Sequence, residues 1–189
     1  MKPGRLLAYA YVLMLLVITI LPAFSAEGYS LLRHTTSQLG AQNTPNAWVM
    51  NVVFVALGVA VVVESWWGLG GYRFQQIVLI IFGLSLILTA VFRHAPITEG
   101  VAFSASADNW HSVFATLVGF SFTLFAVSAA FIPAAMKRRL LALFMAAVAT
   151  LLSLLIFQVP QFAGIWQRTM FVVSFGWLLE FFWNSGGQT

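Results

Sequence analysis

The sequence predicts an all-α, polytopic integral membrane protein in which six transmembrane helices form one bundle. Hydrophobic residues occupy 61% of its 189 positions and charged residues only 7%, whereas a soluble domain carries roughly a quarter charged residues. The mean hydropathy is +0.93. Six apolar runs each approach the length of about 20 residues that crosses roughly 30 Å of hydrocarbon. Because these runs use most of the chain, we expect a single domain over residues 1–189.

The first predicted span, residues 6–24, follows Lys2 and Arg5. It ends in small residues, as a secretory signal does, but it is longer than the usual apolar region of about 7 to 15 residues, so we expect it to be retained. Residues 25–46 then form the longest polar stretch of the chain. The other spans are predicted at residues 47–67, 74–92, 110–132, 140–157 and 162–183.

Turn residues and aromatic residues mark the limits of these spans. Trp48 begins the second span and Trp66 and Trp67 end it, as expected for an interfacial aromatic belt. Prolines break the chain between the other spans, because proline disfavours helix both at its own position and before it. These prolines are Pro45, Pro96, Pro133 and Pro160.

The basic residues predict the orientation, because short cytoplasmic connections are enriched in lysine and arginine. One side carries Lys2, Arg5, Arg73, Lys137, Arg138 and Arg139, and the other carries Arg33, Arg93, Glu27, Glu99 and Asp108. We therefore expect both termini to be cytoplasmic, in the cytoplasmic membrane of a prokaryote. The basic residues are too few and too scattered to follow a nucleic-acid backbone, so no nucleic-acid partner is expected.

Small and charged residues within the spans predict packing contacts. Gly58 and Gly83 lie in mid-span, and Ala115 and Gly119 form a small-xxx-small pair, all of which allow close helix packing. Near the side predicted to be cytoplasmic, Glu64 could pair with Arg73. Glu180 could likewise meet the basic cluster at residues 137–139.

The polar residues that could bind a ligand or take part in catalysis lie at the opposite ends of the spans, on the side predicted to face away from the cytoplasm. All three histidines of the chain, His34, His94 and His111, fall there, together with Arg33, Arg93, Asp108 and the slightly deeper Arg168. Arg168 lies about 9 Å along its predicted helix at 1.5 Å per residue, where a charge is costly without a partner. We expect it to face the bundle with Gln167, Asp108 or a bound anion, the alternative being that it snorkels to the interface.

Asp108 and His111 are three residues apart and would share one helical face, about 5 to 6 Å apart at Cβ. A carboxylate there could orient the imidazole as a general base or as a metal ligand, although aspartate is also favoured at a helix N-terminus for structural reasons. Adding His34 and His94 would reach the ligand count of a zinc site, but no metal-binding spacing is present. Bis-histidine haem at His94 and His111 is a weaker alternative. The chain has no cysteine, which excludes disulfides and thiolate ligands.

The segment from His34 to Asn51 reads His-Thr-Thr-Ser-Gln-Leu-Gly-Ala-Gln-Asn-Thr-Pro-Asn-Ala-Trp-Val-Met-Asn. Its Ser-x-Leu-Gly-Ala and Pro-x-Ala-Trp portions resemble the domain of unknown function 998 family of small multi-helix membrane proteins. The family pattern continues with a Phe-Pro-x-Asp-like connection, a histidine that opens the next span and a Gln-Arg pair in the last helix. His111 and Gln167-Arg168 fit this pattern. The connection departs from it, because it reads Phe-Arg-His-Ala-Pro at residues 92–96, and the family aspartate is missing or displaced to Asp108. The resemblance implies the fold more than the function.

Two main hypotheses for function follow. The first is an uncharacterised membrane protein that binds a lipid head group or small anion in a polar vestibule at the non-cytoplasmic face. Its predicted ligand-binding residues are Arg33, His34, Asn51, Arg93, His94, Asp108, His111, Gln167 and Arg168. The second is a membrane-embedded lipid hydrolase, which uses either Asp108 and His111 as orienter and base or a metal ion such as zinc.

The hydrolase hypothesis rests on analogy with lipid-remodelling membrane hydrolases that use serine, aspartate and three histidines. Its catalytic candidates are Asp108, His111 and Ser37, and its metal candidates are His34, His94, His111 and Asp108. A transporter is favoured less, because no inverted repeat or broken helix is evident. A structural subunit, with another membrane protein or a second copy as partner beside membrane lipid, is a further alternative.

Overall fold

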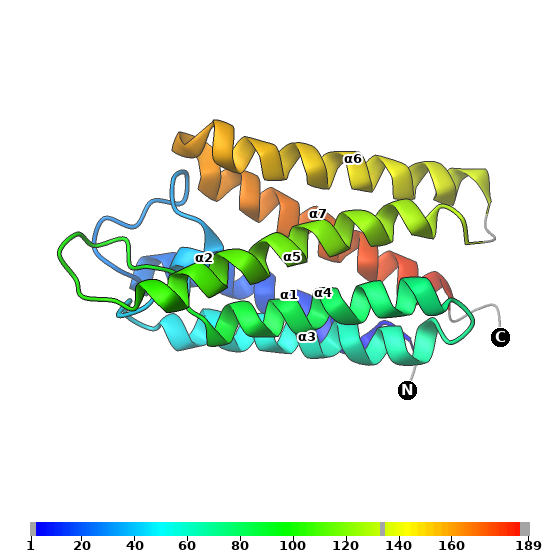
Figure 1. Cartoon of the computed structure of the whole chain (residues 1–189), viewed down its shortest axis with the longest axis horizontal. Coiled ribbons are helices and arrows are strands. Elements are labelled where there is room, and N and C mark those ends of the chain that lie inside the picture. Colours follow the sequence, from blue (N-terminus) through cyan, green and yellow to red (C-terminus); the bar gives the residue numbers. More distant parts are fainter. Residues whose placement is uncertain (1–2, 133–134, 186–189) are drawn as a thin grey trace.

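The computed structural model describes residues 3–132 and 135–185, and all regular structure in these residues is helical, as predicted. Six long helices lie side by side along one bundle axis (Figure 1). They are α1 (Arg5–Ile20), α3 (Ala47–Gly68), α4 (Arg73–Val91), α5 (Ala105–Ala129), α6 (Met136–Gln158) and α7 (Ala163–Ser185). A short helix, α2 (Thr36–Leu39), lies in the first connection, and two 3₁₀ turns, η1 (Leu21–Phe24) and η2 (Pro160–Phe162), follow α1 and precede α7.

Five of these helical segments are long and apolar enough to cross a membrane, so the chain is a multi-pass membrane protein. They are Arg5–Phe24, α3, α4, α5 and α6. The sixth predicted span corresponds to α7, which has 23 residues but is not among the five. It carries the polar residues Gln167, Arg168 and Glu180. That the chain crosses the membrane six times therefore remains a prediction.

The fourth predicted span begins too late, because α5 starts at Ala105 and not at residue 110. Ser104 is its N-cap, and the Ser104 hydroxyl accepts a hydrogen bond of 3.3 Å from the backbone N–H of Ala107. Asp108, expected just before the span, consequently lies in the first turn of the helix.

Helices that follow one another in the chain pack together, and α1 also contacts α3 and α7. The predicted packing role of Gly58 and Gly83 is confirmed. A Cβ atom on Gly58 would lie 2.5 Å from the Gly83 carbonyl oxygen, and one on Gly83 would lie 2.6 Å from that of Gly58. Only glycine permits this approach of α3 to α4. Gly119 is less tight, since its nearest neighbour would be the Ser153 hydroxyl at 3.8 Å.

The core of the bundle is aromatic and centres on α7. Phe175 is almost fully buried, and its ring centroid lies 5.7 Å from that of Phe82 in α4. Trp177 packs edge-on against Phe122 of α5 at 5.8 Å. These contacts hold α7 against the middle of α4 and α5, which places the residues at its first turns beside the first connection.

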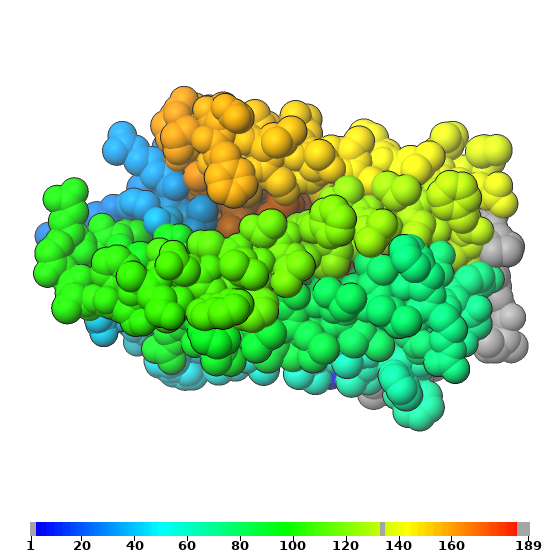
Figure 2. Space-filling view, in the orientation of Figure 1, coloured from blue at the N-terminus to red at the C-terminus, as the bar shows by residue number. Residues whose placement is uncertain are grey.

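The connections at residues 25–46 and 92–104 and the turn between α6 and α7 lie at one end of the bundle, here called the loop end. The start of α1, the end of α7 and the α3–α4 turn lie at the other, the terminal end (Figure 1). In the space-filling view of Figure 2, atoms of the second connection cover part of the first at the loop end. Gln42 joins the two, because its backbone N–H donates to the His94 carbonyl over 2.9 Å and its side chain exchanges two hydrogen bonds with the Ser104 backbone.

The two ion pairs suggested at the terminal end, Glu64 with Arg73 and Glu180 with the basic cluster at residues 137–139, do not form among the described residues. Glu64 accepts hydrogen bonds from the backbone N–H groups of Gly4 at 2.8 Å and Leu6 at 3.1 Å, and so caps α1, while Arg73 donates to Gln76. A buried carboxylate at a helix N-terminus meets unpaired N–H groups and the positive end of the helix dipole, which an exposed arginine does not outweigh. Glu180 accepts from Asn184 at 2.6 Å and forms no ion pair within the described residues.

Candidate functional site

Arg168, in the second turn of α7, holds the first connection against the bundle. Its Nη1 donates to the carbonyl oxygens of Leu31 at 3.1 Å, His34 at 2.8 Å and Gly164 at 3.0 Å. Its Nη2 donates to the hydroxyl of Tyr29 at 2.6 Å, and the guanidinium carbon lies 5.7 Å from the centroid of that ring. The guanidinium therefore binds the segment of residues 29–40, here called the 29–40 loop.

Gln167 fixes the next part of the same loop. Its Oε1 accepts hydrogen bonds from the Thr36 backbone N–H at 2.7 Å and the Thr36 hydroxyl at 2.6 Å. These groups begin α2, whose other end groups are satisfied by a capping box between Thr35 and Gln38. One amide oxygen on α7 thus positions the first turn of α2, and the adjacent Ser37 is buried with its N–H directed to the same oxygen.

Gly164 allows the 29–40 loop to lie directly on the first turn of α7. Its N–H donates to the Leu32 carbonyl at 2.9 Å, which satisfies one of the free N–H groups of the helix start. A Cβ atom at this position would lie 2.5 Å from the carbonyl oxygen of His34 and even closer to that of Leu31. Gly164, Gln167 and Arg168 thus form one continuous receiving surface for the loop.

Arg168 is partly buried and faces the bundle, as the sequence analysis expects. Of its candidate partners, neither Asp108 nor Gln167 accepts a hydrogen bond from it, because four groups of its own helix and the 29–40 loop do so instead. The Arg168 Nε is buried without a hydrogen-bond partner in the described part of the chain. The main structural role of the Arg168 side chain is therefore to hold the 29–40 loop in place.

His34 is half-buried next to this network. Its Nδ1 accepts a hydrogen bond of 2.9 Å from the Ser30 backbone N–H, and its ring centroid lies 5.3 Å from that of Tyr29. Burial lowers the pKa of His34, and the positive charges of Arg33 and Arg168 lower it further. The pKa of Tyr29 is raised by burial, against which the charge and hydrogen bond of Arg168 act.

Arg33 is the exposed cation of the 29–40 loop. Over residues 3–132 and 135–185 its side chain forms neither an ion pair nor a hydrogen bond. It follows Leu31 and Leu32, whose side chains are 46% and 52% exposed. The loop therefore presents an unpaired guanidinium beside exposed apolar side chains. Arg93, in the second connection, is likewise exposed.

A second cluster forms where α4 ends and α5 begins. The Asp108 carboxylate accepts a hydrogen bond of 2.7 Å from the Ala95 backbone N–H and lies 3.7 Å from the Nδ1 of His94. Asp108 thus contacts His94 and forms no hydrogen bond with His111, which differs from the pairing that helical spacing suggested. The ring centroids of His94 and His111 lie 5.3 Å apart in an edge-on arrangement.

His111 is buried, and the positions of its neighbours determine its tautomer. Its Nδ1 lies 2.8 Å from the Phe92 carbonyl and 3.0 Å from the Thr89 carbonyl. Since both partners are acceptors, we assign the proton to Nδ1. The Nε2 atom then carries a lone pair, and it is buried without a hydrogen-bond partner among the described residues.

The predicted site residues thus divide into two clusters. Arg33, His34, Gln167 and Arg168 belong to the first, and His94, Asp108 and His111 to the second. Across the described residues no group of three or more histidine, aspartate or glutamate side chains is arranged to hold a metal ion. His34, His94, His111 and Asp108 therefore do not form the ligand set considered from the sequence.

Asn51 belongs to neither cluster. It is buried, and its Nδ2 donates to the Gly40 carbonyl over 3.0 Å. A Cβ on Gly40 would lie 2.6 Å from the Asn51 Oδ1, so the two residues fit each other and hold the end of the 29–40 loop on α3. This contact gives a structural reason for the Leu-Gly-Ala and Trp-x-x-Asn portions of the segment.

Three residues of the site were not predicted from the sequence. Tyr29 contacts Arg168, Thr36 contacts Gln167, and Gly164 packs against the backbone of the 29–40 loop. One signal was available for Gly164: it stands four residues before Arg168, so the two share one face of a helix. Nothing local in the sequence points to Tyr29 or Thr36, since each meets its partner across more than 130 positions.

Comparison with known proteins gives one match. The model of a family described as "Protein of unknown function (DUF998)" matches residues 9–184. No curated protein and no solved structure matches the chain.

Proposed function

This chain belongs to the DUF998 family, a family of unknown function, and we propose that it binds the phosphate of an anionic lipid head group, or a small anion of the same chemistry, at the loop end. The observation that carries the proposal is the unpaired, exposed guanidinium of Arg33 on a loop that Arg168 holds in place. Guanidinium groups bind phosphate through two parallel hydrogen bonds, which makes arginine well suited to this ligand.

The electrostatics of the 29–40 loop support an anionic ligand. Arg33 and Arg168 both lie near enough to His34 to lower its pKa. No carboxylate forms an ion pair with either arginine in the described ranges. A phosphate beside Arg33 would offset this accumulated positive charge.

The apolar side chains around Arg33 favour a lipid over a free anion. Leu31 and Leu32 are about half exposed on the same loop, and Phe24 and Trp48 are exposed near its two ends. Aromatic and aliphatic side chains at this level of a membrane protein contact the boundary between head groups and acyl chains. In the orientation predicted from the basic residues, this end faces away from the cytoplasm, and we place the chain in a prokaryotic cytoplasmic membrane.

In this proposal the polar residues have different tasks. Arg33 contacts the phosphate, with His34 beside it and Arg93 as a second exposed cation at the same end. Gln167, Arg168 and Asn51 position the 29–40 loop and do not themselves need to touch the ligand. The sequence hypothesis instead counted Asn51, Gln167 and Arg168 among the ligand-binding residues.

Native mass spectrometry tests the proposal. Wild-type protein extracted in maltoside detergent is expected to retain anionic phospholipid, and Arg33→Gln is expected to lose it. Arg73→Gln is the matched control, because it removes one exposed arginine charge from the terminal end. Equal retention by wild type and Arg33→Gln would contradict the proposal. Titrating delipidated protein with inorganic phosphate separates a free anion from a head group, since only the former saturates the site without acyl chains.

A lipid hydrolase is a second candidate, and one observation favours it. The Asp108 carboxylate lies 3.7 Å from the Nδ1 of His94, which also contacts the Ala95 carbonyl at 2.8 Å. The ring of His111, whose Nε2 has no hydrogen-bond partner among the described residues, lies 5.3 Å from that of His94, and a carboxylate beside two imidazoles can support proton transfer. Ser37 contacts Gln167, so it belongs to the other cluster. Ester hydrolysis by purified protein that is lost in His94→Gln and in His111→Ala would support this candidate. Unchanged hydrolysis in both variants would contradict it.

A further inference from the structure

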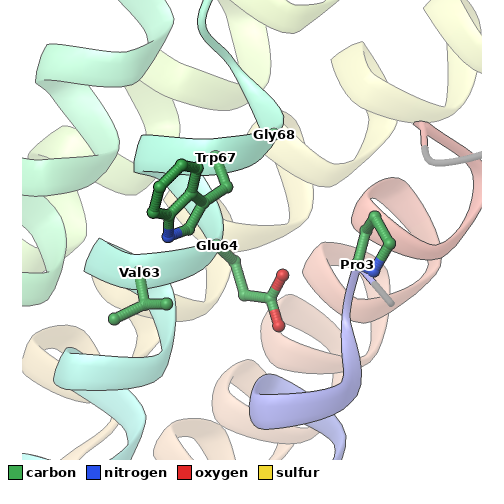
Figure 3. A pocket seen from close by; sticks show the side chains of 5 residues that line it. All are labelled: Pro3, Val63, Glu64, Trp67 and Gly68. Atoms are coloured by element: carbon green, nitrogen blue, oxygen red, sulfur yellow. The ribbon is translucent and has the colours of Figure 1, made fainter. Parts of the chain in front are cut away.

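An open cavity of about 270 Å³ lies at the terminal end of the bundle, far from the site described above. It is lined by Pro3, Val63, Glu64, Trp67 and Gly68 (Figure 3). We propose that this cavity binds a quaternary ammonium or related organic cation, with Glu64 as the counter-ion and the indole of Trp67 as the aromatic face.

Glu64 supplies the negative group. Its side chain is only 4% exposed, yet it lines the cavity, and Figure 3 shows its carboxylate in view between the indole of Trp67 and the ring of Pro3. Each oxygen accepts one backbone N–H from the start of α1. A carboxylate has about four lone-pair positions, so about two remain for a further partner.

The arginines at this end do not neutralise Glu64. Arg73 is engaged with Gln76, and Arg5 is exposed on the first turn of α1. Neither forms an ion pair with Glu64 in the part of the chain that the structure describes. Buried carboxylates are normally paired or fully hydrogen-bonded, and Glu64, with two backbone N–H partners, also lines the cavity.

Trp67 makes the cavity selective for a particular kind of cation. Its side chain is 80% exposed and lines the cavity, so the indole is accessible to a ligand. Aromatic faces attract cations, and tryptophan does so most strongly, particularly toward quaternary ammonium groups that are poorly hydrated. The cavity is smaller than the roughly 300 to 1,000 Å³ of typical small-molecule sites, so it suits a head-group-sized cation.

Ligand-observed NMR tests this site on the full chain in maltoside detergent, with tetramethylammonium chloride as the probe. Saturation transfer from protein to probe is expected for the wild type. Trp67→Leu is expected to weaken the apparent affinity about fivefold, as the loss of a cation–π contact implies. Trp66→Leu is the matched control, because Trp66 is also exposed, at 57%, but does not line the cavity; it should bind as the wild type does.

Charge is tested separately. Glu64→Gln should weaken binding, and Glu180→Gln, which neutralises an exposed carboxylate on α7, should not. Because Glu64 also caps α1, its variant can lose folding, in which case the Trp67 pair of variants decides. The uncharged isostere of choline, 3,3-dimethylbutan-1-ol, should give no transfer where choline does. Equal transfer from choline and its isostere, or full binding by Trp67→Leu, would overturn the proposal.

The source of the cation is distinguished in nanodiscs. If the ligand is a lipid head group, discs of phosphatidylcholine should suppress transfer to free tetramethylammonium, whereas discs of phosphatidylglycerol should not. Transfer that is the same in both discs and still depends on Trp67 assigns the site to a free organic cation. Arg33→Gln should bind tetramethylammonium normally, so this site and the anion site fail or succeed independently.

Discussion

The Nη2 of Arg168 donates to the hydroxyl of Tyr29 over 2.6 Å, and that hydroxyl in turn contacts the carbonyl oxygens of His34 and Thr35. Most hydrogen bonds of this charged side chain in a bundle helix are thereby made to neutral acceptors of a single loop, and one is made to the Gly164 carbonyl of its own helix. This relationship explains why Arg168 needs no carboxylate partner. It also leaves Arg33, on the same loop, as the cation available to a ligand.

Arg168→Gln should destabilise the protein by about 2 to 3 kcal/mol, because hydrogen bonds from a charged donor are lost and partly buried carbonyls stay unsatisfied. The free energy of unfolding in an SDS titration measures this. Arg138→Gln, which removes an exposed arginine at the start of α6, should change stability by less than about 0.5 kcal/mol. Equal stability of the two variants would mean that Arg168 does not hold the loop.

Gly164→Ala should cost about 1 to 3 kcal/mol by overpacking, because its methyl group would enter the space of the His34 and Leu31 carbonyl oxygens. The same variant should also weaken anion binding, since the loop must move away from α7. Gly119→Ala is the control in another helix, where the nearest atom is 3.8 Å away, and alanine should be neutral or slightly stabilising there. Thermal unfolding of both variants decides between these outcomes.

His34 should make stability depend on pH. Burial, then Arg33 and Arg168, lower its pKa in the folded protein below the ordinary value of 6.5. The unfolded chain therefore binds more protons at mildly acidic pH, and the stabilising contribution, which is complete above about pH 6.5, is lost as the pH falls toward the folded pKa. His34→Asn, whose Oδ1 can still accept from Ser30, should flatten this part of a stability profile. A profile that is identical for wild type and variant would refute the assignment.

The histidine tautomers give a test without mutation. Nitrogen-15 NMR should find His111 protonated at Nδ1, which faces two carbonyls, and neutral His34 protonated at Nε2, because its Nδ1 accepts from Ser30. The two ring nitrogens have distinct shifts in each tautomer. An Nε2-protonated His111 would contradict the hydrogen bonds at the end of α4.

Much of the fold follows from hydropathy, because each helix must satisfy its own backbone in lipid. The limits of α5 were predicted less well, since Ser104 is an N-cap outside the apolar run. For the site, the cost of a buried charge predicts that Arg168 matters, but its partners in the 29–40 loop lie over 130 positions away and could not be found from local spacing. Helical spacing also favoured His111 for Asp108, whereas His94 and the Ala95 N–H, supplied by a loop, contact it.

The most direct test of anion binding is the pKa of His34, measured by NMR in nanodiscs with and without anionic phospholipid. A phosphate bound to Arg33 favours the charged imidazole, so the pKa of His34 should rise in phosphatidylglycerol relative to a zwitterionic lipid in the wild type. In Arg33→Gln this lipid-dependent rise should disappear, while Arg73→Gln should keep it. A pKa of His34 that does not change with the lipid, or that rises equally in Arg33→Gln, would contradict the proposal that Arg33 binds a phosphate at the loop end.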